Sequence, residues 1–258
     1  MAILEVANLS KHFGGLKAVA NLTFRVEEGK ISGIIGPNGA GKTTVFNCLT
    51  GIYPPTHGEV RFLGDRIENL RPFQVAQKGL VKTFQANRIF PELTVWQNVQ
   101  IGLESCVKGS PLAEIFGGEK VREAGRKQGE KIREILGFVG LENEKGLLAR
   151  NLPHGSQRRL AIGITLATRP RLLLLDEPAT GMNSEEKATM LGLIKKINEN
   201  GVNILLIEHD MKLVMNICEH LVVLNYGEKI AEGRPRDISQ NEAVIAAYLG
   251  RKGAKCFA

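Results

Sequence analysis

The sequence predicts an α/β fold built on a largely parallel, doubly wound β-sheet, and three observations support this prediction. Short apolar runs of strand length alternate with helical patterns near the N-terminus and again after residue 170. One apolar run leads directly into a glycine-rich segment and then into a helix. Between about 94 and 165 the strand-like runs disappear, so that a separate helical part is expected there.

The composition restricts the class of protein. The 258 residues are 43% hydrophobic and 24% charged, which is ordinary for a globular chain and excludes wholesale disorder. No apolar run approaches the roughly 18 residues of a membrane span. Glu5 interrupts the N-terminus and no apolar signal segment follows it, so we expect a cytosolic protein. The four cysteines are scattered without metal-ligand spacing, which favours reduced thiols.

Strands and helices are expected in a regular order along the first part of the chain. The apolar patterns predict strands at 3–9, 18–26, 30–35 and 58–62, and helices at 42–50 and 72–78. Gly51 and the pair Pro54-Pro55 stop the first of these helices.

The second part begins with a charged amphipathic helix and returns to buried strands. The helix is expected at 119–139, and the strands at 171–176, 203–208 and 220–224. Asn183, with Glu186 three residues later, predicts the start of the helix that separates the first two of these strands.

The strongest motif is a glycine-rich phosphate loop that satisfies the pattern GxxxxGK[ST] between a buried strand and a helix. Its glycines allow successive backbone N–H groups to point into one concavity at a helix N-terminus, which suits phosphate. Lys42 would contact the β- and γ-phosphates of a nucleotide, and the Thr43 hydroxyl would bind Mg²⁺. The nucleotide-binding residues are Gly36, Pro37, Asn38, Gly39, Ala40, Gly41, Lys42, Thr43 and Thr44.

Two carboxylates follow a run of four leucines. Asp176 comes at the end of the expected strand, where open α/β sheets place ligands, and Glu177 comes next. Asp176 could hold Mg²⁺ through water, and Glu177 could polarise a water that attacks the γ-phosphate. The alternative, plain surface charge, fits poorly after an apolar strand. The guanine-reading pattern NKxD is absent from the sequence, which disfavours a GTPase.

The formal charge of +7 is unevenly distributed. Residues 69–91 and 145–175 contain lysines and arginines but no carboxylate. Such stretches suit phosphates, nucleic acid or an acidic surface, and a merely solvated face is about equally compatible with them.

Taken together, the motifs resemble the ATP-binding subunit of an ABC transporter over nearly the whole chain. In that family's pattern, Phe13 stacks on adenine, Gln85 of Thr83-Phe84-Gln85 touches Mg²⁺ and the membrane partner, and His209 contacts the γ-phosphate. The residues alone leave Phe13 open as a core aromatic and give His209 no role.

The resemblance implies a P-loop NTPase (RecA-like) core with an antiparallel β subdomain and an inserted α-helical subdomain. Residues 1–94 would hold the first part of the core with the β subdomain, and 95–165 the helical subdomain with the signature motif. Residues 166–235 would complete the core, and 236–258 would form a C-terminal helix and tail.

The similarity extends to the ATP-binding proteins of branched-chain amino acid uptake systems. The residues that carry it are FGGLKAV (13–19), TTVFNCLTG (43–51), GLVKTFQ (79–85), HGSQRRLAI (154–162), LLIEHDMKLVM (205–215) and AYLG (247–250). This resemblance implies two membrane permease subunits, a second ATP-binding subunit in an ATP-bridged dimer, and an extracytoplasmic solute-binding protein that acts indirectly. The chain would then lie on the cytoplasmic face of the membrane. The stretch 85–98 would receive the permease, although Phe90 and Trp96 could equally be core residues of the helical part.

The signature motif departs from the family's LSGGQ. It is Leu152, Pro153, His154, Gly155 and Ser156 here, and Asn183 stands where an aspartate is usual. The signature caps the γ-phosphate held by the opposite subunit, and Pro153 offers neither a hydroxyl nor an N–H for this. Either His154 or Ser156 could donate instead. We therefore expect the site with this chain's Lys42, Asp176 and Glu177 to hydrolyse ATP, and the partner's site to be weaker.

Two other functions compete with the ATPase motor of an importer. A soluble ABC-type ATPase acting on nucleic acid or ribosomes would suit the positive charge, but such proteins usually carry two ATPase units or extra inserts that this sequence lacks. A regulator that binds nucleotide without hydrolysis conflicts with Glu177 and His209. The sequence does not identify the transported solute.

Overall fold

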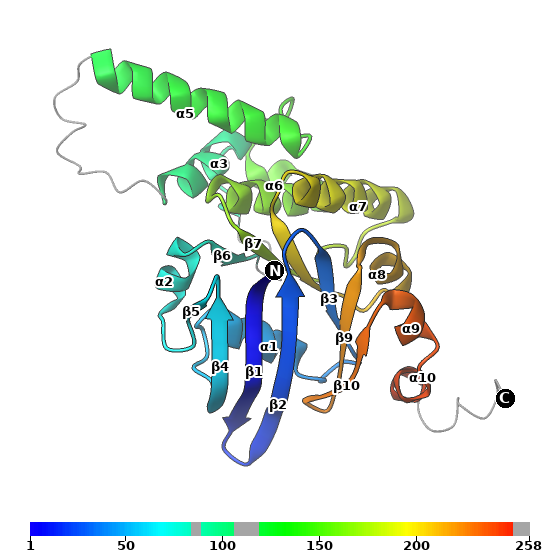
Figure 1. The fold of residues 1–258 in the computed structure, drawn as a ribbon. Helices are drawn as coiled ribbons and strands as arrows, with labels where there is room; N and C mark the ends of the chain where they lie inside the picture. The colour runs from blue at the N-terminus through cyan, green and yellow to red at the C-terminus, as the bar shows by residue number, and fades with distance from the viewer. Residues whose placement is uncertain (84–88, 106–118, 250–258) are drawn as a thin grey trace. The chain divides into compact units, whose positions relative to one another are not determined.

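A computed structural model describes residues 1–83, 89–105 and 119–249 and divides the chain into two compact units (Figure 1). The first unit contains Met1–Lys82, Arg171–Thr180 and the chain from Leu191 onward. The second contains Thr83–Pro170 and Gly181–Met190.

The first unit contains a six-stranded sheet with the order β10-β9-β3-β8-β7-β6. Its strands are parallel except β10, which pairs antiparallel with β9. Three of them, β3, β7 and β8, are buried at every residue, as expected for strands covered on both faces. The strands are β3 (Ile31–Ile35), β6 (Leu80–Lys82), β7 (Leu172–Asp176), β8 (Asn203–Ile207), β9 (His220–Asn225) and β10 (Glu228–Gly233).

The N-terminal strands form a second, antiparallel sheet in the same unit, with the order β2-β1-β4-β5. Buried and exposed residues alternate along much of β2, which is the pattern of a sheet with one covered face. This sheet is made of β1 (Ala2–Phe13), β2 (Leu16–Glu27), β4 (His57–Phe62) and β5 (Asp65–Arg66).

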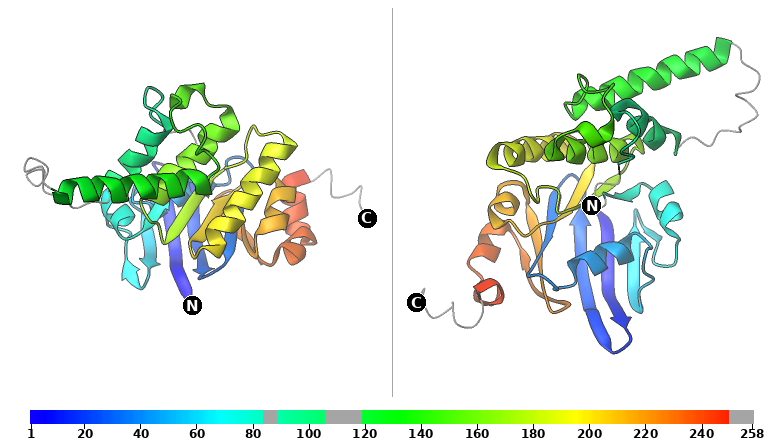
Figure 2. Two further views of the ribbon diagram at one scale, coloured as in Figure 1. Left: turned by 90° about the horizontal axis from the view of Figure 1, so that it is seen from above. Right: turned by 180° about the vertical axis from the view of Figure 1, so that it is seen from behind.

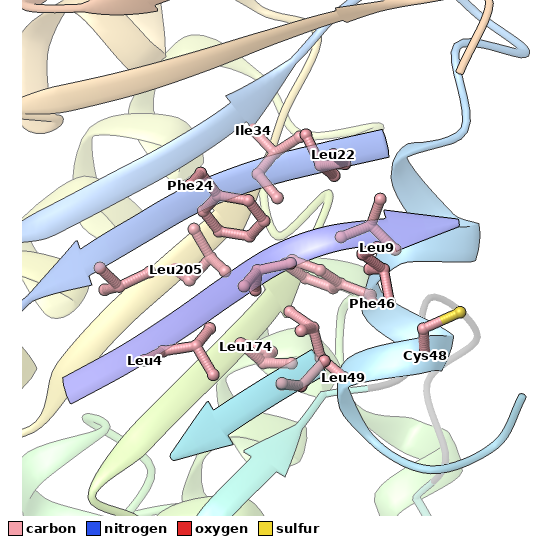
Figure 3. Close-up of a cluster of buried hydrophobic side chains, with 14 of the residues drawn as sticks. Leu4, Leu9, Leu22, Phe24, Ile34, Phe46, Cys48, Leu49, Leu174 and Leu205 are labelled. Carbon is pink, nitrogen blue, oxygen red and sulfur yellow. The ribbon is translucent and has the colours of Figure 1, made fainter. Parts of the chain in front are cut away.

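The core of the first unit combines side chains from both sheets and from α1 (Lys42–Leu49) (Figure 3). Leu4 and Leu22 come from the antiparallel sheet, and Leu174 and Leu205 from the parallel sheet. Phe46 of α1 is fully buried among them. Burying a side chain of this size stabilises the fold by about 2–3 kcal/mol, so this cluster anchors the helix that follows the glycine-rich loop.

Further helices of the first unit precede β6 or follow β8, and β10 lies beside β2 (Figure 2). The N–H of Ala20 in β2 donates a hydrogen bond of 2.9 Å to the carbonyl of Gly227, in the turn between β9 and β10. The helices are α2 (Pro72–Gln77), α8 (Met211–Ile217), α9 (Pro235–Ser239) and α10 (Glu242–Leu249). A longer helix, α7 (Ser184–Glu199), begins in residues of the second unit and ends in residues of the first.

The second unit is helical. Asn98, which is fully buried, accepts a hydrogen bond from the N–H of Phe90 and donates to three carbonyls between Phe90 and Thr94. It therefore fixes the loop before α3. The helical elements are α3 (Val95–Glu104), α5 (Glu119–Phe138), η1 (Ala149–Asn151) and α6 (His154–Ala167).

The predicted α/β fold is confirmed, and the expected strands and helices are present. Three short strands were not predicted: β5, β6 and β10. The glycines and the proline of 108–111 and 117–118 predict loops, but these residues lie outside the described part of the chain. Within the described residues, no helix combines the length and the apolar character of a membrane span.

Candidate nucleotide-binding site

The glycine-rich loop connects β3 to α1 and has a backbone that only glycine accommodates at two points. Gly36 has φ +152°, and a Cβ there would lie 2.1 Å from the carbonyl oxygen of Leu224. Gly41 has φ +98°, and a Cβ there would lie 2.5 Å from the carbonyl oxygen of Ala18. The loop is thus held against neighbouring backbone on both sides, which preorganises its N–H groups.

Lys42 starts α1 and folds back over the loop. Its Nζ donates to the carbonyls of Gly36 at 2.7 Å and Pro37 at 2.9 Å, and the residue is only 7% exposed. Burial lowers the pKa of Lys42, while the nearby carboxylates of Glu177 and Asp176 oppose this shift. The ammonium is therefore placed within the loop, where phosphate oxygens can replace the two carbonyls as acceptors.

Asp176 ends β7 with a carboxylate that is 1% exposed. Nζ of Lys82, from the neighbouring strand β6, lies 2.9 Å from its Oδ2. Within the described residues, no donor makes a well-directed hydrogen bond to either carboxylate oxygen of Asp176. A buried carboxylate with unused acceptor capacity suits a metal ion or its bound water.

Glu177 follows in a strained conformation, with φ +49°. Its N–H donates to the carbonyl of Ile207 at 2.9 Å, and its Oε2 accepts from the Thr180 hydroxyl at 3.2 Å. Nδ1 of His209 lies 3.8 Å from its Oε1. Positive φ at a non-glycine residue costs about 1–3 kcal/mol and persists where surrounding bonds enforce it, often at reactive sites.

Glu208 links the two loops that carry Glu177 and His209. Its buried carboxylate accepts the N–H of Ala179 at 3.1 Å and that of His209 at 3.2 Å. Burial raises the pKa of Glu208, and these backbone N–H groups oppose the rise. The residue therefore ties the loop after β7 to the loop after β8.

Phe13 presents an aromatic face at the end of β1. It is 42% exposed, which excludes a role as a core residue, and it contacts Tyr53 edge to face with ring centroids 5.3 Å apart. Nζ of Lys11 lies 5.0 Å from the Phe13 centroid and donates to the carbonyl of Pro54 at 2.8 Å. These contacts hold the Phe13 ring in place while it remains partly exposed to solvent.

The predicted signature residues lie at the start of α6 in the second unit. Pro153 and His154 are exposed, whereas Gly155 and Ser156 are buried. The Ser156 hydroxyl accepts a hydrogen bond from Arg159 at 3.0 Å. Of the two candidate donors, His154 is therefore the solvent-accessible one.

Several cations of the two acid-free stretches are paired with carboxylates from elsewhere in the chain. Lys78 contacts Asp65, and Arg150 contacts Glu92, both at 2.6 Å. Gln85 and Arg88 lie outside the described residues. The stretches 69–91 and 145–175 therefore carry less unpaired positive charge than their sequence suggests, because the acids that pair with these cations lie outside them.

Sequence reasoning missed two residues beside the phosphate loop. Lys82 was one cation of the stretch 69–91 and one residue of the segment GLVKTFQ (79–85), and neither assigned it a role. It lies at the end of β6, a short strand that the sequence did not predict. Tyr248 of α10 has a buried hydroxyl that faces the backbone of Gly36; burial raises its pKa to about 12. Tyr248 belongs to the motif AYLG (247–250), which supports the family resemblance but assigns no role to the tyrosine.

A sequence model described as ABC transporter matches residues 19–180, across the phosphate loop and Asp176. The chain belongs to the ABC transporter family. A second model, described as branched-chain amino acid ATP-binding cassette transporter, matches residues 228–254. ATP as the bound nucleotide follows from this membership, and the resemblance found in the sequence is confirmed.

Individual ABC proteins match over almost their full length. The high-affinity branched-chain amino acid transport ATP-binding protein BraF of Pseudomonas aeruginosa is 46% identical over 96% of this chain and 98% of its own. LivG of Escherichia coli, which has the same description, is 41% identical over the same shares. A solved ATP-binding cassette of an ABC transporter in its ADP conformation superposes with a TM-score of 0.84 and 32% identity, covering 97% of this chain and 100% of that one.

Proposed function

We propose that this chain binds and hydrolyses ATP to energise the uptake of branched-chain or related amino acids through partner permease subunits. The observation that carries the proposal is the common edge reached by β3 and β7, both of which pair with β8. This edge brings the phosphate loop, Asp176 and Glu177 together at the carboxyl ends of parallel strands. The relatives BraF and LivG, described as branched-chain amino acid transport proteins, support the choice of solute class.

The nucleotide would be held at three points. The backbone N–H groups of 36–44 would surround the phosphates, Lys42 would neutralise the β- and γ-phosphates, and Phe13 would stack on adenine. Gly36 and Gly41 support this role because their packing leaves no room for a Cβ.

The residues fit a magnesium ion beside the phosphates. Asp176 supplies buried carboxylate oxygens, and Thr43, which is exposed at the start of α1, supplies a hydroxyl. Gln85 is the third proposed ligand. Mg²⁺ usually takes one or two protein carboxylates and completes its shell with phosphate and water oxygens, and it neutralises the charge that develops on the transferred phosphate.

Glu177 would orient the attacking water and accept its proton. The strained backbone and the Thr180 hydroxyl fix the direction of its carboxylate. His209, half exposed and 3.8 Å from Glu177, would contact the γ-phosphate. Glu208 supports both residues by joining their loops.

The partners follow from the family and from the departures in the signature motif. A second, different ATP-binding subunit would complete an ATP-bridged dimer on the cytoplasmic face of the membrane, with an extracytoplasmic solute-binding protein acting indirectly. Phe90, which is 46% exposed, would belong to the permease-facing surface, whereas Trp96 packs against Gly129 and Arg133 of α5. Pro153 would make the partner's ATP site the weaker one.

The test is Glu177→Gln in the complete transporter in vesicles. We expect ATP turnover to fall at least tenfold while ATP binding persists, since a general base contributes roughly 10²–10⁴ in rate. Glu199→Gln, an exposed change on α7, is the control and should leave turnover unchanged. Turnover near the wild-type rate in the Glu177 variant would show that the working site has been misassigned.

A further inference from the structure

Lys82 makes a buried ion pair with the carboxylate proposed to face Mg²⁺. Its side chain is 7% exposed and that of Asp176 is 1% exposed, with 2.9 Å between Nζ and Oδ2. A buried charge is strongly destabilising unless a counter-charge lies close by, so each member of this pair depends on the other.

The ammonium of Lys82 is also held on its other side by α1. It donates to Oδ1 of Asn47 at 3.2 Å and lies 5.6 Å from the centroid of Phe46. Both residues belong to the helix that begins with Lys42 and Thr43. The position of the charge is thus set by β6, β7 and α1 together, all of which belong to the first unit.

Lys42 of the phosphate loop interacts with Asp176 electrostatically, but the direct ion pair of Asp176 within the described residues is with Lys82. Nζ of Lys42 is bonded to the carbonyls of Gly36 and Pro37. Asp176 has one ion pair within the described residues, and its partner is Lys82. Both acceptor oxygens remain short of well-directed hydrogen bonds.

We propose that Lys82 is a built-in counter-ion for Asp176. Its ammonium compensates the negative charge of the Asp176 carboxylate until Mg·ATP binds and a divalent cation takes over that role. Lys82 is thus a positioning residue: it keeps the buried carboxylate compensated and directed toward the phosphate loop, and it opposes binding of a metal ion without nucleotide. The inference rests on the proposal that Asp176 faces Mg²⁺, and it gives a role to Lys82, which the sequence analysis left without one.

A neutral side chain of similar length tests this. In Lys82→Met, Asp176 loses its counter-charge, so the full chain should melt at a lower temperature than wild type. Mn²⁺ added without nucleotide should then raise the melting temperature of this variant by about 2–4 °C, through binding to the native state alone. The wild type should show no such shift, because Lys82 already compensates the carboxylate.

Three further variants separate electrostatics from packing. Lys82→Arg retains the charge and should remain insensitive to Mn²⁺. The double variant Lys82→Met/Asp176→Asn removes both charges, and should lose the Mn²⁺ response while recovering part of the lost melting temperature. Lys78→Met breaks the exposed pair with Asp65 instead and should neither lower the melting temperature appreciably nor create a response.

The outcomes distinguish this inference from the proposed function. If Mn²⁺ shifts Lys82→Met and wild type equally, or shifts neither, Lys82 is not a counter-ion and serves only in packing. Stabilisation of the wild type by Mg·ATP is measured in the same experiment; its absence would instead contradict the proposed nucleotide site. A Mn²⁺ shift that persists in the double variant would place the metal away from Asp176 and overturn the inference.

Discussion

The first turns of α1 and α6 differ from the first turns of the other long helices. Within the described residues, both begin without a side-chain cap, at Gly41 and Pro153 respectively. Side chains cap four other helices of seven or more residues, namely Thr94 at α3, Asn183 at α7, Asp210 at α8 and Asn241 at α10. A missing side-chain cap costs about 1 kcal/mol, because N–H groups of the first turn then lack an acceptor. An uncapped first turn is therefore consistent with a ligand that accepts hydrogen bonds from these N–H groups.

The two uncapped turns are unequally prepared for an anion. Around α1, the loop is pressed against neighbouring backbone and Lys42 is buried within it. At α6, Pro153 supplies no N–H, and a Cβ on Gly155 would lie 2.7 Å from Oε1 of Glu186. A carboxylate beside a helix N-terminus already satisfies its positive end. The difference supports the proposal that the loop before α1 would bind phosphate in its own right, whereas the start of α6 would need its partner.

The largest expected effect comes from Gly41→Ala. The side chain would combine an unfavourable φ with a contact of 2.5 Å to the Ala18 carbonyl, and we expect a loss of about 3 kcal/mol in the free energy of unfolding. Stabilisation by Mg·ATP should disappear as well. Denaturant unfolding with and without Mg·ATP measures both effects.

Gly39→Ala is the matched control for this change. Gly39 also has positive φ, at +79°, but a Cβ there meets nothing within 4 Å, so a cost of about 1 kcal/mol is expected. Equal losses in the two variants would contradict the view that the loop is held by contact with neighbouring backbone.

The sequence predicted the fold and the position of Asp176 at the end of a buried strand because those features are local. A buried strand, a glycine-rich loop and a helix follow one another in 30–50, and Asp176 follows its strand directly. The counter-charge of Asp176 was not predictable, because Lys82 reaches it only through the pairing of β6 with β7. The same limit applies to Phe13, whose ring contacts Tyr53, forty residues later in the chain.

The second prediction concerns pH and uses the buried carboxylate of Glu208, which joins the loops after β7 and β8. Burial raises the pKa of Glu208 above its ordinary value. The unfolded chain therefore releases this proton at lower pH than the folded chain, and stability falls as the pH rises through the raised pKa.

Glu208→Gln removes this dependence and keeps an oxygen that can accept from Ala179 or His209. The free energy of unfolding of Glu208→Gln minus that of wild type should therefore increase as the pH is raised from 4 to 8. Urea titrations across this range measure the slope. Glu186→Gln, which acts at α6 on a partly exposed carboxylate, should show no comparable trend. A difference between Glu208→Gln and wild type that stays constant with pH would show that burial of Glu208 has no part in the stability of this site.

The smallest effect concerns Glu186 itself, which serves two helices. Its Oε2 accepts the N–H of Asn183 in the capping box of α7, and its Oε1 lies beside Gly155 at the start of α6. Glutamine preserves the capping box, so Glu186→Gln removes only the charge. We expect a loss of about 0.5 kcal/mol that shrinks with added salt, from the weakened interaction with the two helix dipoles.

Glu185→Gln gives the matched comparison, because Glu185 also lies in the first turn of α7, whereas the three atoms nearest to a Cβ at Gly155 all belong to Glu186. The two variants should lose the same contribution at α7 and differ by the contribution at α6. In the assembled transporter, removal of the Glu186 charge should also make the start of α6 more receptive to a phosphate and raise ATP turnover at the partner's site, while Glu185→Gln should not. Identical behaviour of the two variants would mean that the carboxylate near Gly155 does not weaken that site, and the lower activity expected there would then depend on Pro153 alone.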